Sequence, residues 1–290
     1  MGFGTNQMNT GVLSGAVFVP QNWSRDVELA RESAKVMAGI VNRRDFDAVD
    51  GNIINIPFVS NLVTSAIVSD GQANFQMPQE SEVQVNINRY FESSVAIEYK
   101  LSLQSKYELA MKYRGKIAEA LDRNIETDLT GLYSSASQIV GSGSVAVTEA
   151  NVVRGIQYLN QANAPQKDRH VVVSPGGMNN LQQISRYTDY QTTGQKPSPN
   201  TGANNGLVGN VSGLPVHMTT NIQAPASTGV VTNHNLIFQK DFATLAMQKK
   251  VSIMIEDRPS YFCTGYIATA LWGFALLRQD HLVDLQSQSN

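Results

Sequence analysis

The side chains that most often carry catalysis or bind metal are few in this sequence and stand far apart. Four histidines occur, and no spacing among them is typical of metal ligands: His170, His217, His234 and His281. The sequence contains no nucleophile elbow and no dinucleotide fingerprint, and the stretch at 141–148 lacks the lysine that a phosphate-binding loop needs. We therefore expect no catalytic residue, no metal site and no cofactor, and hence no enzyme.

The single cysteine, Cys263, cannot form an intramolecular disulfide, which fits a reducing cytoplasm. Its neighbours Tyr261, Phe262 and Tyr266 are typical of a packed strand, so we expect an inert core thiol.

Two acids, Asp122 and Glu126, stand four residues apart on a predicted helix. Basic residues surround them, so we expect a solvated helix face.

Basic residues gather along that same helix, where they are either a solubilising face or a candidate DNA-facing surface: Lys106, Lys112, Arg114, Lys116 and Arg123. The chain as a whole carries a net charge of -2 with a pI near 6.1. Proteins that hold nucleic acid mainly by neutralising phosphates usually have a strong basic excess. Any contact with a polyanion must therefore be local.

With 290 residues and 42% hydrophobic side chains, the chain can bury a sizeable core. The first residues have neither the basic region nor the apolar region of a secretory signal, and no stretch has transmembrane length. Charged residues make up only 16% of the chain, which favours a neutral, hydrogen-bonding surface of the kind that partners often bury.

Two alternating segments predict a long hairpin. The first spans 52–69, and in the second Val83, Val85 and Ile87 alternate with polar residues. The tip between them is rich in Asn and Gln, and Phe75 and Met77 are its large apolar side chains. An isolated two-stranded ribbon is marginal in water, so another surface must cover its apolar side.

The hairpin lies between a polar arm and an unusually long helix. Residues 1–20 read as a flexible arm, and 20–44 form an amphipathic segment that includes Trp23 and closes with Arg43 and Arg44. After the hairpin, Ser105 and Glu108 form a capping-box pattern. An apolar stripe then predicts a helix of about 28 residues, with these positions buried: Ala110, Ile117, Leu121, Ile125, Leu129 and Leu132.

Beyond the break at 141–144 the pattern becomes a compact mixture of helices and strands. Thr148 caps one predicted helix, 169–175 reads as a buried strand, and Ser174 with Pro175 opens a second helix. The segment 191–206 reads as a long loop, and the remainder is rich in strands.

This order of parts resembles the major capsid proteins of tailed bacteriophages, the Hong Kong-97-like family. "VNRRDFDAVDGNIINIPFV" looks like the family's entry to its extended loop, and "EYKLSLQSKYELAMKYRGKIAEALDRNIETDLTG" looks like its spine helix. "DRHVVVSPGGMNNL" and "GLVGNVSGLPVHMTTNI" resemble parts of its axial domain, and "YIATALWGFALLRQDHLVDL" resembles its closing strands. The resemblance covers about residues 20–285.

The resemblance implies an α+β capsid fold with four parts. These are an N-terminal arm at 1–48, an extended hairpin loop at 49–98, a peripheral domain with the spine helix at 99–147 and 240–272, and an axial domain at 148–239 and 273–290. It further implies a shell subunit whose copies form hexamers and pentamers around phage DNA, with weak, non-specific DNA contact. Hairpin and arm would lie on neighbouring subunits through Phe75, Met77, Val83, Val85 and Ile87, and through Trp23, Arg43 and Arg44.

Two departures from the family pattern shape these expectations. No lysine occurs between Gly51 and Glu98, so the Lys-to-Asn crosslink of some relatives has no hairpin lysine, and we expect a non-covalent shell. The chain also begins close to the arm, which leads us to expect a separate scaffolding protein. A portal and a decoration protein are further partners that the resemblance implies. The resemblance places the assembled protein in the virion, built in the host bacterial cytoplasm, without membrane contact.

Two other readings fit parts of the sequence. An encapsulin-type compartment shares the fold but needs a groove for a cargo peptide near the N-terminal helix, and no such groove is recognisable in "NWSRDVELARESAKVM". A hydrolase or sugar-binding α+β protein would place a site beside the loop at 191–206. The lack of a catalytic constellation disfavours that third reading.

Overall fold

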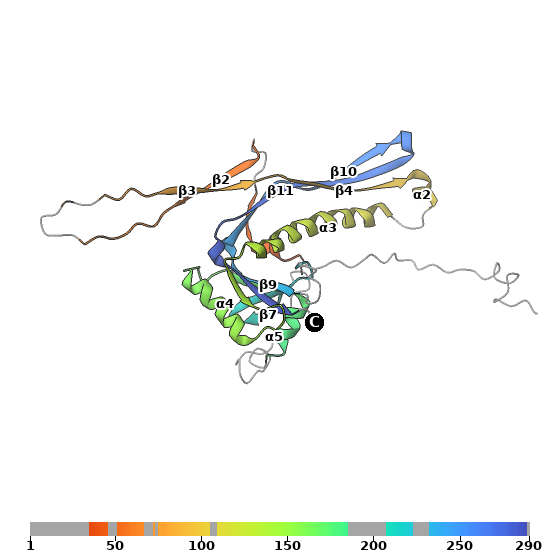
Figure 1. Cartoon of the computed structure of the whole chain (residues 1–290). Helices are drawn as coiled ribbons and strands as arrows, with labels where there is room; N and C mark the ends of the chain where they lie inside the picture. The colour runs from red at the N-terminus through yellow and green to blue at the C-terminus, as the bar shows by residue number, and fades with distance from the viewer. Residues whose placement is uncertain are drawn as a thin grey trace, which may run out of the picture.

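The computed structural model describes residues 35–45, 51–66, 72, 75–104, 109–184, 207–222 and 232–288. The predicted residues Trp23, Ser105, Lys106 and Glu108 and the loop at 191–206 lie outside these ranges. Within them the chain forms an elongated sheet with a long helix beneath it, a projecting hairpin, and a compact unit below (Figure 1).

The elongated sheet has four strands in the order β1-β10-β11-β4. They are β1 (Asn42–Asp45), β10 (Ala243–Arg258), β11 (Cys263–Leu276) and β4 (Arg89–Glu98). β1 pairs in parallel with β10, and the other pairs are antiparallel. The expected hairpin range of 49–98 therefore contains a ten-residue strand, β4, that belongs to this sheet.

Beneath the sheet runs α3 (Leu109–Thr130), followed by a 3-10 turn at Gly131–Ser135. A separate short helix, α2 (Tyr99–Gln104), precedes it. The predicted helix of about 28 residues agrees with α3 over 22 residues; its predicted start at Ser105 lies outside the described residues, and its end beyond Thr130 is a 3-10 turn instead. The predicted stripe is confirmed where side chains are described: Ile117, Leu121, Ile125, Leu129 and Leu132 are buried.

These side chains form one core between α3 and the sheet. Trp272 and Tyr266 of β11 belong to it, together with Phe238 and Leu282 from the compact unit. Trp272 also donates a hydrogen bond from Nε1 to Asp128 on α3 at 3.1 Å. The long helix is therefore fixed to the sheet along its length by packing and at one point by a directed polar contact.

The compact unit contains a six-stranded mixed sheet in the order β5-β12-β9-β6-β8-β7. Its strands are β5 (Gln138–Gly141), β12 (Leu282–Gln288), β9 (Thr232–Gln239), β6 (Arg169–Val173), β8 (Leu214–Met218) and β7 (Leu207–Val211). Helices α4 (Glu149–Gln161) and α5 (Pro175–Gln182) pack on it around a second core. The predicted caps are confirmed, since Thr148 and Ser174 accept hydrogen bonds from the amides of Asn151 and Gly177.

The hairpin consists of β2 (Ile53–Val59) and β3 (Glu80–Asn86), paired antiparallel from Ile53 opposite Asn86 to Val59 opposite Glu80. It projects beyond one end of the elongated sheet, while α2 and the β10–β11 turn lie at the opposite end (Figure 1). Before it, α1 (Met37–Ile40) is a single turn that leads into β1. None of the described helices is long and apolar enough to cross a membrane.

Candidate assembly surfaces

The distal half of the hairpin is exposed and apolar. Phe75 and Met77 are 92% and 94% exposed, and Val59, Leu62 and Val63 are exposed on the leg before them. The two legs stay together beyond the paired strands, because the Ser60 amide donates to the Gln79 carbonyl at 3.0 Å. Large apolar side chains on a projecting ribbon are typical of an interaction site.

The base of the hairpin, in contrast, is covered by its own subunit. Val85 has no exposed surface, and Ile87 and Ile56 are also buried. They pack with Ala246, Leu271, Ala275 and Leu277 of the β10–β11 region. The expectation that Val85 and Ile87 contact a neighbouring subunit is therefore wrong, whereas Val83 is half-buried.

The hairpin crosses the sheet at Gly273 of β11. A Cβ added to this glycine would lie 2.3 Å from the backbone oxygen of Asn86 and 2.8 Å from the Cα of Ile87. Contacts this short cannot be made without moving the backbone, so only glycine lets β3 pass so close to the strand. This residue was not singled out from the sequence, because a glycine within a strand does not by itself indicate which segment approaches it.

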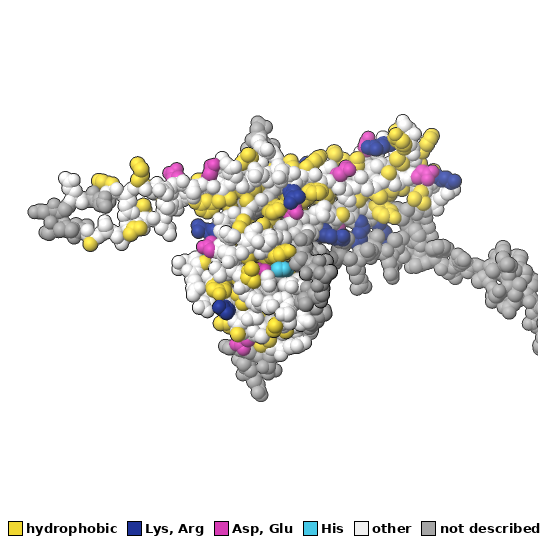
Figure 2. All heavy atoms as spheres, viewed as in Figure 1, with side chains coloured by type: hydrophobic (Ala, Val, Ile, Leu, Met, Phe, Trp, Pro, Cys, Tyr) yellow, Lys and Arg dark blue, Asp and Glu magenta, His cyan; other side chains and the backbone are white. Residues whose placement is uncertain are grey.

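The described candidate DNA-facing residues lie on two sides of α3. Arg114 lies over the ring of Tyr266 on β11, 4.9 Å from its centroid, and so points into the subunit. Lys116 forms a 2.7 Å ion pair with Glu119. Lys112, Lys116 and Arg123 share one side of α3 by their spacing, and Figure 2 shows Lys and Arg side chains gathered below the helix.

Glu126 corrects the expectation of a solvated acidic face. Its side chain is fully buried, and its carboxylate accepts hydrogen bonds from the amides of Val36 and Met37 at 2.8–3.0 Å, and from that of Ala38 at 3.4 Å. Burial raises the pKa of Glu126, and the amide hydrogen bonds oppose that rise. One turn earlier, Asp122 pairs with Lys35 at 2.7 Å. Together these acids clamp residues 35–38 onto α3.

The described end of the predicted arm therefore belongs to the subunit's own fold. Val36, Met37 and Val41 are buried in the core under α3, and 42–45 form the edge strand β1. Arg43 and Arg44 are exposed on that edge. Their contact with a neighbouring subunit stays a prediction, as does that of Trp23, which lies outside the described residues.

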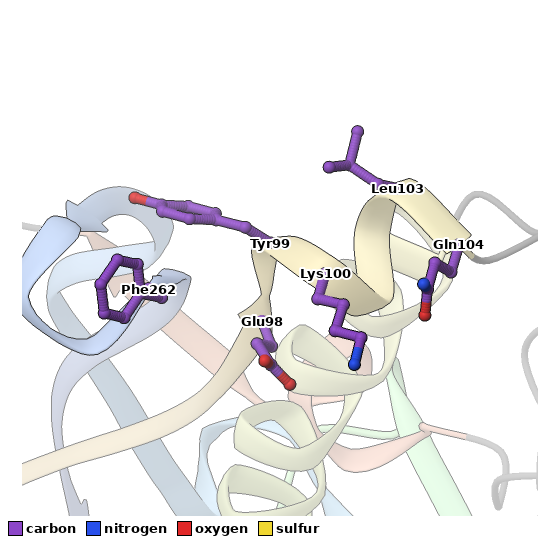
Figure 3. Close-up of a pocket in the computed structure, with 6 residues that line it drawn as sticks. All are labelled: Glu98, Tyr99, Lys100, Leu103, Gln104 and Phe262. Carbon is purple, nitrogen blue, oxygen red and sulfur yellow. The ribbon is translucent and has the colours of Figure 1, made fainter.

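A hollow of about 360 Å³, drawn in Figure 3, lies beside α2, at the end of the sheet opposite the hairpin (Figure 1). Tyr99, Lys100 and Leu103 of α2 line it together with Phe262 of the β10–β11 turn. The Tyr99 amide donates to the Phe262 carbonyl at 2.9 Å, and the Tyr99 hydroxyl donates to the Asp257 carboxylate. This last hydrogen bond raises the pKa of Tyr99 to about 12.

The histidines form two side-chain pairs that their sequence spacing did not reveal. His170 Nδ1 and His217 Nε2 are 3.3 Å apart, and burial together with the neighbouring imidazole lowers the pKa of His170. His234 Nδ1 lies 2.8 Å from Asp284. Both pairs join neighbouring strands of the six-stranded sheet, β6 with β8 and β9 with β12. A register-based pairing of this kind becomes visible only once the strand order is known.

No group of three or more His, Cys, Asp or Glu side chains in the described ranges is arranged to hold a metal ion. Cys263 begins β11 at the end of the sheet and is partly exposed, so the expectation of a core thiol is wrong.

Comparison with known proteins gives matches at the level of structure alone. No protein-family profile matches the sequence, and no curated protein matches it. The capsid structure of Cyanophage P-SCSP1u has a TM-score of 0.74 at 14% identity, over 95% of each chain. A structure from Mycobacterium phage Che8 has a TM-score of 0.72 at 19% identity, over 92% of this chain and 97% of that one.

The acid-stable capsid structure of Helicobacter pylori bacteriophage KHP30 matches over 100% of both chains, with a TM-score of 0.69 at 10% identity. Because these likenesses span nearly the whole of each chain, they include the hairpin, the long helix and the compact unit together. The expected α+β architecture is confirmed: the chain has the fold of these phage capsid structures.

Proposed function

We propose that the chain is the major capsid protein of a tailed bacteriophage, a structural subunit whose copies form the icosahedral head around the genomic DNA. The observation that carries this proposal is the projecting hairpin. Its base is seated on its own subunit, while Phe75 and Met77 at its distal end are almost fully exposed. A ribbon built in this way reaches beyond its own chain to bury its tip.

The free energy of assembly is the sum of many such contacts. Burial of one Phe or Met side chain contributes about 1.5–3 kcal/mol, so a single hairpin contact is modest. In a closed symmetric shell each subunit gives one hairpin and receives another, and many such contacts acting together make the shell durable. We place these contacts within hexameric and pentameric rings of subunits. The hairpin lacks lysine, and we propose that the contacts are non-covalent.

The same proposal assigns the other partners. The protein works as a non-enzymatic component of the virion and assembles in the host cytoplasm with a scaffolding protein, a portal and a decoration protein. Packaged DNA is confined by weak contacts, since many tight phosphate contacts would resist packaging and ejection. The ion pair of Lys116 with Glu119 and the inward position of Arg114 support weak contact.

A shortened hairpin tests the proposal. Residues 61–78 are replaced by Asn-Gly, a two-residue turn that joins Ser60 to Gln79, which are already hydrogen-bonded. We expect a soluble subunit with the circular dichroism of the wild type that no longer forms shells in electron micrographs. Phe75→Ser with Met77→Ser, which keeps the hairpin length, is the matched variant and should also assemble poorly. Shells of normal size from either variant would contradict the role of the hairpin.

A further inference from the structure

The histidines gather where the compact unit meets the core of α3. Of the four in the chain, His217, His234 and His281 are buried and His170 is half-buried. The compact unit lies below α3 (Figure 1). Four of its buried side chains join the core of that helix, and we call this contact the seam: Val172, Leu236, Phe238 and Leu282.

Strand alternation places three of the histidines on the seam side of the six-stranded sheet. On β9, Phe238 belongs to the seam and Ile237 to the second core, so His234 lies on the seam side. On β6, His170 stands two residues before Val172 of the seam, and its ring centroid is 6.1 Å from that of Phe238. The third histidine, on β8, reaches the same side through its contact with His170.

This contact joins His217 Nε2 to His170 Nδ1 at 3.3 Å. A hydrogen bond between two imidazoles needs one N–H and one bare nitrogen, so it is lost when both rings are protonated. Two positive charges would then lie side by side. Burial and the neighbouring imidazole lower the pKa of His170; Lys240 acts in the same direction, and Asp168 opposes it.

His281 lies in one of the two 3-10 turns that connect the two sheets, the turn Gln279–His281 between β11 and β12. Its Nδ1 is buried and has no hydrogen-bond partner among the described residues. Burial lowers its pKa. The charged groups that face it have opposing effects, since the aspartates raise the pKa and the arginines lower it: Asp280, Arg278, Asp241 and Arg169.

We propose that the pair of His170 with His217, together with His281, forms an acid-sensitive latch that holds the compact unit on the α3 core at neutral pH and releases it as the pH falls. A histidine whose pKa is lowered in the closed chain takes up protons when its surroundings open. Its stabilising contribution is therefore full above the ordinary pKa of 6.5, and is lost as the pH falls below that value. The latch belongs to the single subunit, so it does not depend on the proposed function.

His234 serves as the control on the same side of the sheet. Its Nδ1 lies 2.8 Å from the Asp284 carboxylate, and its ring stacks on that of Tyr133 with the centroids 4.0 Å apart. A positive charge on this imidazole would be paired, so its protonation gives no reason for the seam to open. Glu126 on α3 titrates in the opposite direction, and its effect cancels when variants that all retain it are compared.

Hydrogen exchange of the purified full chain at about pH 7.5 and about pH 5.5, corrected for the intrinsic rates, tests the latch. The amides of Leu277 and Arg278 report on the connection, because both donate to the Phe242 carbonyl, at 2.7 and 3.0 Å. At the lower pH we expect their exchange to accelerate by up to about tenfold for each histidine that takes up a proton, since this pH lies about one unit below 6.5. The amides of α4, on the other side of the sheet, should stay protected.

Glutamine variants assign the effect to the histidines. The triple variant His170→Gln, His217→Gln and His281→Gln removes the titration and keeps side chains that donate and accept hydrogen bonds. It should lose the acceleration, whereas His234→Gln should keep it. Equal acceleration in the wild type and the triple variant, or its loss in His234→Gln, would overturn the inference. Simultaneous opening of residues 277–278 and α4 in the wild type, or no acceleration there, would also overturn it, even if the triple variant does not fold.

Discussion

Glu126 and Asp128 show how single acids on α3 determine where other segments lie. Glu126 binds the amides of Val36 and Met37, and Asp128 accepts the indole N–H of Trp272. The first contact holds the segment before β1, and the second holds the sheet. A buried carboxylate is stable only when hydrogen bonds replace its lost hydration, and the amides of residues 36–38 supply them here.

The raised pKa of Glu126 predicts a pH dependence of stability. A carboxyl group whose pKa is higher in the folded chain binds protons on folding. Its stabilising contribution is therefore full below the ordinary pKa of 4.5 and is lost as pH rises through the raised value. We expect the free energy of unfolding of the unassembled wild type to fall, relative to Glu126→Gln, as the pH rises above the ordinary pKa of 4.5. Parallel curves in urea titrations would contradict this account.

A charge placed in the stripe of α3 should abolish the subunit. Leu121 is buried between the helix and the sheet, so Leu121→Asp places an unpaired carboxylate in an apolar core, at a cost of several kcal/mol. Asn124→Asp, which adds the same charge on the exposed side of α3, is the control and should stay soluble. The soluble fraction after expression measures both, and a soluble, assembling Leu121→Asp would contradict the assigned core.

At the scale of the elements, the hairpin is an arm whose direction is set by its own subunit. Its base packs on the β10–β11 region, and the ring of Phe58 lies 5.5 Å from the guanidinium of Arg278. The crossing at Gly273 determines how closely β3 approaches the sheet. The tip therefore projects from a base whose position is fixed by its own subunit.

Gly273→Ala should move the base of the hairpin away from β11 without unfolding the subunit. The added methyl group would lie 2.3 Å from the Asn86 oxygen, and relief to an ordinary contact of about 3.5 Å needs a backbone shift of about 1 Å. Gly265→Ala, also on β11, meets its nearest atom at 3.5 Å and is the matched control. We expect assembly to be impaired only by Gly273→Ala, as counted in electron micrographs. Equal assembly of the two variants would show that the crossing does not direct the hairpin.

The elements were predictable wherever their pattern is local. Alternation revealed the hairpin legs, and the apolar stripe revealed which side of α3 is buried. The burial of Glu126 and Val85 was not predictable, because it depends on segments about 90 to 190 residues away along the chain, 36–38 and 246–277 respectively. The pattern also carried the long helix past Thr130, since helix periodicity does not distinguish an α-helix from the 3-10 turn at Gly131–Ser135 that follows it.

At the scale of the whole molecule, the basic residues of α3 are divided among different tasks. Arg114 packs on Tyr266, and Lys116 pairs with Glu119. Combined with a net charge of -2, this predicts that the unassembled subunit binds duplex DNA no tighter than the micromolar range of ordinary non-specific binding. Filter binding across a salt series measures it. Nanomolar affinity with a steep salt dependence would mean that α3 carries a true nucleic-acid surface.

The central claim is that this subunit builds a closed shell from copies of itself. Electron microscopy of the purified full-length protein, alone and after co-expression with a scaffolding protein, tests it most directly. The account predicts closed icosahedral particles whose hexamers and pentamers are bridged by hairpins. Monomers or amorphous aggregates under every condition, or hairpins folded back on their own subunits within a particle, would contradict it.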